Sequence, residues 1–154
     1  MNRFLVAAGL VIAGLATSAV VAAPAQAAGI EFDPGVHRPA IQACAQAQRF
    51  TFTATQYFNP GDCWQTPAST LVMQFDGALW LYFVGGGACY TPTIGYSGAV
   101  GVFQGDGNLV IYYGSTPVWD SGTAGNPNSR LILRGGDGAL LIRNEAGQEI
   151  WRAC

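Results

Sequence analysis

Five side chains suited to contact hydroxyl groups recur at every second position between residues 104 and 112. They are an amide, a carboxylate, a second amide, an aliphatic group and a phenol, in the order Gln104, Asp106, Asn108, Val110 and Tyr112. Alternate residues of an extended chain point to the same face, so the five would lie side by side. Together they can donate and accept hydrogen bonds, so this face could bind a ligand that carries several hydroxyl groups.

The segment that must position these side chains is predicted to be a β-hairpin. The sequence Gly-Asp-Gly at 105–107 predicts a three-residue loop in which Gly107 adopts the left-handed conformation of a bulge. Gln104 then lies opposite Asn108, and the polar residues share the outer face. The other face carries the apolar residues expected in the core, which are Phe103, Leu109 and Ile111.

This hairpin is one of three copies of a repeated unit. Asp-Gly pairs recur at a nearly constant spacing, each between short apolar runs, at Asp76-Gly77, Asp106-Gly107 and Asp137-Gly138. Trp119 and Trp151 follow the second and third pairs at nearly the same offset, and Cys89 stands at that offset after the first pair. Three copies predict a pseudo-threefold all-β domain in which each sheet directs an apolar face toward a shared axis.

The composition fits this fold class and disfavours several functions. The chain has 21 Gly and 8 Pro, which is typical of an all-β chain with many turns. Without residues 1–27, 6 Arg stand against 9 acidic residues, a net charge of −3 that argues against a nucleic-acid binder. His37 is the single histidine, which leaves little basis for a histidine metal site or a Ser/His/Asp triad.

Residues 1–27 are predicted to be a signal peptide. Arg3 precedes an apolar stretch over 4–21, and Ala25-Gln26-Ala27 matches an A-x-A cleavage site. A transmembrane anchor is the rival interpretation, but Pro24 follows the apolar run and no basic cluster follows it. No other stretch approaches the roughly 20 apolar residues that span a bilayer. We therefore expect a secreted, extracellular protein without a membrane span.

The pattern from Gln104 to Tyr112 matches the QxDxNxVxY signature of the bulb-type (monocot mannose-binding, B-type) lectins. The chain resembles a secreted bacterial member of that family over about residues 50–154. The resemblance implies a β-prism II fold, with three antiparallel four-stranded sheets about a threefold axis and central tryptophans. It also implies a carbohydrate-binding protein without catalysis, metal or cofactor, whose partners are mannose or mannose-containing glycans. A homo-oligomer stays open.

The resemblance also assigns a role to each residue of the pattern. Gln104, Asp106 and Asn108 would bond O2 and O3 of mannose. Tyr112 would bond O4, and Val110 would touch the C3–C4 edge of the sugar.

The other two repeats depart from the signature. Repeat one keeps Gln74, Asp76 and Tyr82 as a degenerate second site, but Ala78 replaces the Asn and Trp80 replaces the Val. Repeat three loses the site, because an extra Gly enters its loop and three residues change, to Arg134, Ala139 and Arg143. We therefore expect one intact site per chain.

Four cysteines in an exported chain predict two disulfides, and their spacings of 19, 26 and 65, without C-x-x-C, disfavour zinc. Three pairings are open. Because Cys89 takes the place of an axial Trp and Cys63 precedes the same unit, we expect Cys63–Cys89, with Trp64 supplying the missing indole volume. Cys44–Cys154 would then join the two ends of the prism. Cys44 lies in an N-terminal arm, 28–49, in which residues 40–46 form either a short helix or an irregular segment.

Three further patterns admit other chemistry. Residues 95–99, Gly-Tyr-Ser-Gly-Ala, approach a nucleophile elbow but lack its final Gly and an α/β context. The Gly-Asp-Gly loops carry one carboxylate each, too few for Ca²⁺. Asp120, Glu145 and Glu149 could be a glycosidase pair, although the repeats place them in connecting loops. The alternative function is a β-prism that binds no sugar and serves as an interaction or structural module, such as a toxin part, an inhibitor or an envelope protein.

Overall fold

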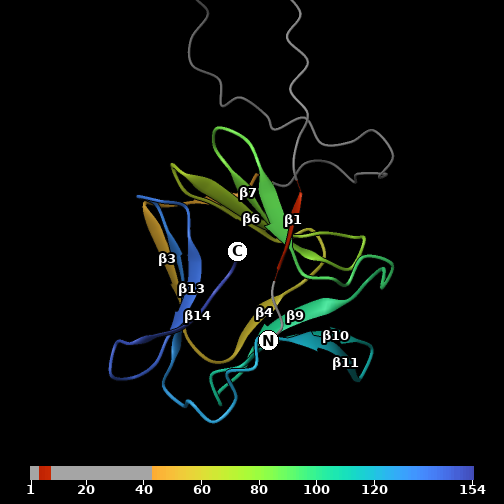
Figure 1. The fold of residues 1–154 in the computed structure, drawn as a ribbon. Helices are drawn as coiled ribbons and strands as arrows, with labels where there is room; N and C mark the ends of the chain where they lie inside the picture. The colour runs from red at the N-terminus through yellow and green to blue at the C-terminus, as the bar shows by residue number, and fades with distance from the viewer. Residues whose placement is uncertain (1–3, 8–42) are drawn as a thin grey trace, which may run out of the picture.

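The computed structural model describes residues 4–7 and 43–154, and it folds them into three sheets around a central axis (Figure 1). The regular elements of this part of the chain are all strands, as the repeat pattern predicts for an all-β domain. Within the same residues there is no helix of the length and apolar character needed to cross a membrane.

Each sheet contains one of the three Asp-Gly hairpins. Sheet one contains, in spatial order, β1 (Leu5–Ala7), β8 (Ala88–Tyr90), β7 (Leu79–Phe83), β6 (Ser69–Met73), β5 (Cys63–Gln65) and β2 (Ala45–Gln46). Sheet two contains β11 (Thr116–Asp120), β10 (Leu109–Tyr113), β9 (Val100–Phe103) and β4 (Gln56–Phe58). Sheet three contains β14 (Glu149–Arg152), β13 (Leu140–Arg143), β12 (Arg130–Arg134) and β3 (Arg49–Phe52).

All strand pairs of the described residues are antiparallel except β2 with β5. The strands β3 and β4 precede the first repeat in the chain, yet they pair with β12 and β9 and so complete sheets three and two. The segment before the repeats therefore ties the three sheets together.

The predicted register of the central hairpin is confirmed. Val102 pairs with Val110 and Phe103 with Leu109, so the residues on each face follow from simple alternation. Fully buried apolar side chains from all three sheets form one core, with Leu71, Leu79, Leu81, Phe103, Leu109, Ile111, Leu131, Leu133 and Leu140 among them. Each such side chain contributes about 1.5–3 kcal/mol through removal from water, which makes this shared core the main source of stability.

Two tryptophans meet at the axis, as the repeat spacing predicts. The ring centroids of Trp119 and Trp151 are 6.1 Å apart, and Cys89 occupies the corresponding place in sheet one, fully buried. The ring that contacts both tryptophans is Phe4, with centroid distances of 5.7 and 5.5 Å. Trp64, which we expected to supply the missing indole volume, packs elsewhere in the core, against Phe52 and Phe58.

Phe4 and β1 belong to the segment predicted to be a signal peptide. β1 pairs with β8 at the edge of sheet one, and Phe4 is 4% exposed. The remainder of residues 1–27, including the predicted cleavage site, lies outside the described residues, and so does His37.

The two disulfides join Cys44 to Cys63 and Cys89 to Cys154, so the expected pairing is wrong. Parallel pairing of β2 with β5 places Cys44 beside Cys63, on the side of sheet one away from β8. After β14 the chain turns inward, and its end lies near the centre of the prism in Figure 1, where it bonds the buried Cys89. The two ends do not meet as expected, because the arm runs alongside β5 at the edge of sheet one. The C-terminus instead reaches the axis and bonds Cys89.

The disulfide of Cys44 ties the described part of the arm to β5. Ala45 and Gln46 form the short strand β2, so this stretch is extended and not helical. Residues 28–42 lie outside the described residues.

Candidate functional site

The turn of repeat two fixes the geometry of the candidate site. Gln104 N–H donates to the carbonyl of Asn108 (2.8 Å), and Gly107 N–H donates to the carbonyl of Gln104 (3.0 Å). Gly107 has φ +85°, and a Cβ at this position would lie 2.1 Å from the carbonyl oxygen of Asn126. Only glycine satisfies both the left-handed backbone and this close approach. Asn126 N–H in turn donates to the carbonyl of Asp106 (2.8 Å), which holds the tip of the loop.

All five predicted residues lie on the outer face of the β9–β10 hairpin, as expected. Gln104 Nε2 donates to the hydroxyl of Tyr112 (2.8 Å), so the two ends of the pattern are in direct contact. Val110 is buried, with 4% of its surface exposed, while Gln104 and Tyr112 are half-buried. Because the Tyr112 oxygen accepts from Gln104, its own proton stays available for a ligand.

Asp106 presents one free carboxylate oxygen. Its Oδ1 accepts from the backbone N–H of Asn108 (3.0 Å), which orients the carboxylate. Its Oδ2 has no partner among the described residues, and the side chain is exposed at the tip of the loop. The oxygen is thus a fixed, solvent-facing acceptor.

Asn108 presents an amide whose orientation is set from behind. Its Oδ1 accepts from Ser121 Oγ (2.9 Å) and from the backbone N–H of Thr123 (3.1 Å). A backbone N–H can only donate, so the oxygen must face Thr123 and the Nδ2 group must face away. Nδ2 has no partner in the described part of the chain. Asn108 therefore offers two oriented donor hydrogens beside the Asp106 acceptor.

The buried hydroxyl groups behind Asn108 were missed by the analysis of the sequence. Ser121 Oγ lies 2.7 Å from Thr123 Oγ1, and Thr123 Oγ1 donates to the carbonyl of Gly107 (2.7 Å). A signal was available, because Ser121-x-Thr123 follows the Asp-Gly pair of repeat two at the same offset as Thr91-x-Thr93 follows that of repeat one. The shared offset marks these hydroxyls as parts of the repeated unit.

Together these groups offer one free acceptor, Asp106 Oδ2, and donors from Asn108 and Tyr112 on the same face of the hairpin. A hydroxyl group at the site could donate to Asp106 Oδ2 and accept from Asn108 Nδ2 at the same time. A neighbouring hydroxyl could contact Tyr112, and a C–H edge could rest on Val110. This arrangement suits a ligand with adjacent hydroxyls.

Repeat one has the same scaffold but a closed surface. Gln74 Nε2 donates to the Tyr82 hydroxyl (2.6 Å), and Asp76 Oδ1 accepts from the backbone N–H of Ala78 (2.9 Å), as in repeat two. However, the indole N–H of Trp80 donates to Asp76 Oδ2 (3.1 Å). The oxygen that is free in repeat two is therefore occupied here, and Ala78 supplies no amide.

The Trp80 ring is itself held between two tyrosines. Its centroid lies 5.3 Å from that of Tyr82 and 4.2 Å from that of Tyr90, with interplanar angles of 6° and 23°. The indole is stacked against both rings. Trp80 therefore covers the part of the outer face where repeat two has only the smaller side chain of Val110.

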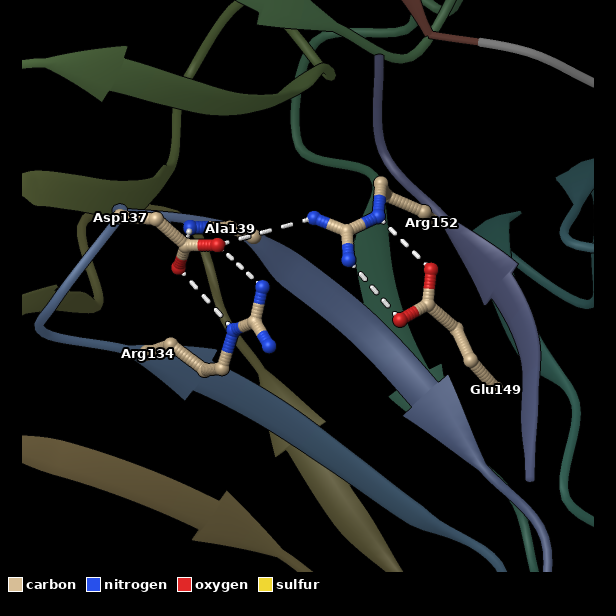
Figure 2. A network of polar contacts seen from close by, with 5 residues as sticks. All are labelled: Arg134, Asp137, Ala139, Glu149 and Arg152. Carbon is tan, nitrogen blue, oxygen red and sulfur yellow. Dashed lines mark hydrogen bonds and ion pairs between the residues drawn. The ribbon is translucent and has the colours of Figure 1, made fainter. Parts of the chain in front are cut away.

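Repeat three replaces the site with a network of charged side chains (Figure 2). Arg134 forms a two-point ion pair with Asp137, and Arg152 lies 3.9 Å from the same carboxylate. Arg152 also donates from Nε and Nη2 to the two oxygens of Glu149, at 2.7 and 2.8 Å. Both oxygens of Asp137 are therefore occupied within the protein.

These contacts shift the protonation equilibria of the network. Desolvation raises the pKa of Asp137, but the Ala139 N–H, the Arg134 guanidinium and the charge of Arg152 together bring that pKa below its usual value. Hydrogen bonds from Arg152 lower the pKa of Glu149, and the same contact raises the pKa of Arg152. All three groups stay charged at neutral pH.

The other candidates do not assemble into a site among the described residues. The loop at 91–98 packs on the turn of repeat one, where Gly95 N–H donates to the carbonyl of Asp76 (2.9 Å). Asp120 belongs to sheet two and accepts from the N–H of Gly122 (2.7 Å), whereas Glu145 and Glu149 belong to sheet three and its turn. No group of three possible metal ligands occurs in residues 4–7 and 43–154.

Solved structures of plant lectins resemble the whole prism. A monomeric monocot mannose-binding lectin of Gastrodia elata matches with a TM-score of 0.59 and 27% identity, covering 70% of this chain and 96% of its own. The mannose-specific agglutinin of snowdrop (Galanthus nivalis), solved with methyl-α-D-mannoside, matches with a TM-score of 0.55 and 28% identity. The match covers 64% of this chain and 90% of the agglutinin. A Polygonatum cyrtonema lectin solved with a monomannoside matches with a TM-score of 0.55 and 26% identity, covering 64% of this chain and 90% of its own.

The likeness confirms the expected fold class, a β-prism II, and the neighbours are named as lectins, which bind carbohydrate without converting it. No protein-family model and no curated protein sequence matches the chain.

Proposed function

We propose that this protein is a carbohydrate-binding lectin of the bulb-type family that recognises mannose or mannose-containing glycans at the outer face of repeat two. The observation that carries the proposal is the pair of unoccupied, oriented groups in this repeat. Asp106 Oδ2 and Asn108 Nδ2 lie two residues apart at the same turn. Each side chain is oriented by the hydrogen bond that its Oδ1 accepts from a backbone N–H. The mannose-specific names of structural neighbours supply the sugar class.

The resemblance to the bulb-type lectins supplies the proposed binding mode. The axial O2 hydroxyl of mannose donates to Asp106 and accepts from Asn108, with Gln104 completing the contacts to O2 and O3. Tyr112 bonds O4, and Val110 rests against the C3–C4 edge. A bond between a neutral hydroxyl and a charged carboxylate is stronger than one between two neutral groups, so Asp106 makes the strongest single contact.

The proposal gives each chain one mannose site. In repeat one Trp80 occupies the carboxylate oxygen, and in repeat three arginines do so. A single monosaccharide site binds weakly, and useful strength then requires clustered glycans or a homo-oligomer.

Isothermal titration calorimetry tests this function. Methyl-α-mannoside should bind with a stoichiometry of about one per chain, and methyl-α-glucoside, which differs at C2, should bind at least tenfold more weakly. A stoichiometry of three would contradict the closed state of repeats one and three. Equal binding of the two sugars would contradict the role of the axial hydroxyl, and absence of sugar binding would favour the structural or interaction module.

We also propose that residues 1–27 are removed on export, so that the mature, secreted chain begins at Ala28. Two disulfides in the described residues support an extracellular location, since such bonds persist in oxidising compartments. Processing would remove Phe4 from its place between Trp119 and Trp151.

The intact mass of the exported protein tests the processing. If the leader is removed, Phe4→Ala leaves the melting temperature of the mature protein unchanged. If the exported chain still contains Phe4, the proposal is wrong, and the same substitution should then destabilise by about 3–5 kcal/mol, as expected for a buried Phe replaced by Ala.

A further inference from the structure

All five arginines of the described residues belong to one sheet. Sheet three carries Arg49 on β3, Arg130 and Arg134 on β12, Arg143 on β13 and Arg152 on β14. Three side-chain carboxylates accompany them, Asp137, Glu145 and Glu149, so five positive charges against three negative ones leave this sheet and its turns at +2. The rest of the described chain has no arginine or lysine and carries the four other side-chain carboxylates, which are Asp62, Asp76, Asp106 and Asp120.

The arginines share the outer face of the sheet. Leu131 and Leu133 are fully buried in the core, so the alternate residues Arg130 and Arg134 of the same strand point outward. Strand register then places like charges directly opposite one another. Arg130 pairs with Arg143, and Arg134 pairs with Arg49.

This arrangement has a cost that the fold does not explain. Like charges directly opposite in a sheet are destabilising. Arg134 and Arg152 are compensated by Asp137 and Glu149. Arg143 also lies opposite Glu149 of β14, but no ion pair of Arg49, Arg130 or Arg143 occurs within the described residues. Nε of Arg143 is buried there without a hydrogen-bond partner.

The charges are grouped at the two ends of the strands. Arg130 and Arg134 stand at opposite ends of β12, which corresponds to about 13 Å along an extended strand. Between the two arginine pairs lies a row without charge, formed by the exposed Thr51, the half-buried Ile132 and Leu141, whose side chain is fully buried. The pair of Arg49 and Arg134 borders a shallow depression, whose other lining residues are Gln48, Gly135, Gly136 and Asp137.

We propose that the outer face of sheet three is a second binding site, for an acidic oligosaccharide that carries carboxylate or sulfate groups. Guanidinium groups bind such groups through two parallel hydrogen bonds, which suits arginine better than lysine. The exposed part of the uncharged row, formed by Thr51 and Ile132, leaves room for the body of a sugar ring between the arginine pairs. Duplex DNA fits less well, because its closely and evenly spaced phosphates would meet Asp137 and Glu149 as well as the arginines.

The site is separate from the mannose site of repeat two. It uses another sheet, different residues and charge in place of neutral hydroxyl contacts. The two predicted ligands should therefore bind the same molecule together.

Surface plasmon resonance with the disulfide-bonded protein tests the proposal, using immobilised heparin as the sulfated probe at physiological salt. The Arg130→Gln/Arg143→Gln variant should lose at least tenfold in affinity, and Arg130→Gln alone, at an exposed position, should lose about threefold. Asn108→Ala is the matched control, with heparin binding unchanged. A wild-type melting temperature shows that each arginine variant is folded, whether or not repeat two binds mannose.

Three results would each overturn a different part of the proposal. Unchanged heparin affinity in the folded Arg130→Gln variant would overturn the proposal. Duplex DNA that competes with heparin at equal charge concentration would overturn the choice of an acidic glycan in favour of a nucleic acid. Mannose that displaces heparin would overturn the separation of the two sites.

Discussion

Repeats one and two share a backbone and differ in what their surfaces leave open. In each, a Gln donates to a Tyr, at 2.6 and 2.8 Å, and an Asp accepts from the backbone two positions later, at 2.9 and 3.0 Å. In each, a buried hydroxyl pair stands 2.7 Å apart behind the hairpin. The differences are confined to two positions of the pattern, where Ala78 and Trp80 stand in place of Asn108 and Val110.

This comparison separates the residues that build the hairpin from those that would meet a ligand. Whatever both repeats retain also serves the fold, including the Gln–Tyr bond and the Asp–backbone bond. The amide of Asn108 and the free oxygen of Asp106 have no counterpart in repeat one, so the proposed function depends on them. Trp80 shows how one side chain can close the surface while the backbone stays the same.

The largest effect should come from adding a methyl group to the turn glycines. A Cβ on Gly107 would lie 2.1 Å from the Asn126 carbonyl oxygen, and one on Gly77 would lie 2.3 Å from that of Tyr96. We expect Gly107→Ala and Gly77→Ala to destabilise by about 1–2 kcal/mol for the backbone conformation and by about 1–3 kcal/mol more for the overlap. Urea unfolding measures both.

Gly147→Ala is the control, because its φ is +81° but no atom lies near the added methyl group. It should cost only about 1–2 kcal/mol, the backbone part. If Gly77→Ala left stability unchanged while Gly107→Ala reduced it, the two repeats would not share the same tightly packed turn.

Asn108→Ala should weaken sugar binding while leaving the hairpin intact. The substitution copies into repeat two the residue that repeat one has at position 78. We expect the free energy of mannose binding to weaken by about 1–3 kcal/mol, the cost of an unpaired hydrogen-bonding group. Calorimetry measures this loss, with Asn144→Ala in the exposed turn of repeat three as the control. Wild-type affinity in Asn108→Ala would refute the assigned role of the amide.

The reverse exchange should open repeat one. In the Ala78→Asn/Trp80→Val variant, Asp76 Oδ2 loses its indole donor, and the Thr91 and Thr93 hydroxyls already lie behind the new amide. We expect the stoichiometry for methyl-α-mannoside to rise from one toward two, with the new site weaker than the native one. A stoichiometry that stays at one in the folded variant would mean that more than these two residues distinguishes the repeats.

The smallest effect concerns the charged network of repeat three. The pKa of Glu149 is lowered in the folded state by Arg152, so this pair stabilises the protein above the ordinary carboxyl pKa and ceases to do so as the pH falls through the lowered value. Because the pair is largely exposed, its contribution should not exceed about 1 kcal/mol. Thermal unfolding of wild type and Glu149→Gln should differ slightly at pH 7, and the difference should shrink as the pH falls below the ordinary carboxyl pKa and through the lowered pKa of Glu149. A constant difference across this range would contradict the assignment.

Much of the fold could be predicted from the sequence because it repeats. The Gly-Asp-Gly loop determines the register of Gln104 with Asn108, and alternation then determines both faces of the hairpin. The disulfide pairing could not be predicted in this way. It depends on where the arm before the repeats and the end after Trp151 run, and neither segment is part of the repeated unit.

The placement of the candidate site's residues on one face was predictable, but the hydrogen bonds that orient them were not. Alternation alone brings Gln104, Asp106 and Asn108 together. The orientation of the Asn108 amide depends on Ser121 and Thr123, which are distant in sequence and meet it only across neighbouring strands. The gathering of arginines on sheet three also required the topology, since Arg49 precedes the repeats and joins β12 only by pairing.

The most direct test of the central claim observes both repeats in one sample. In a ¹⁵N-labelled protein titrated with methyl-α-mannoside, the side-chain amide of Asn108 and the indole N–H of Trp80 report on repeats two and one. We predict a saturable shift of the Asn108 signals while the Trp80 signal stays in place. A saturable shift of Trp80 with Asn108 unmoved would contradict the account.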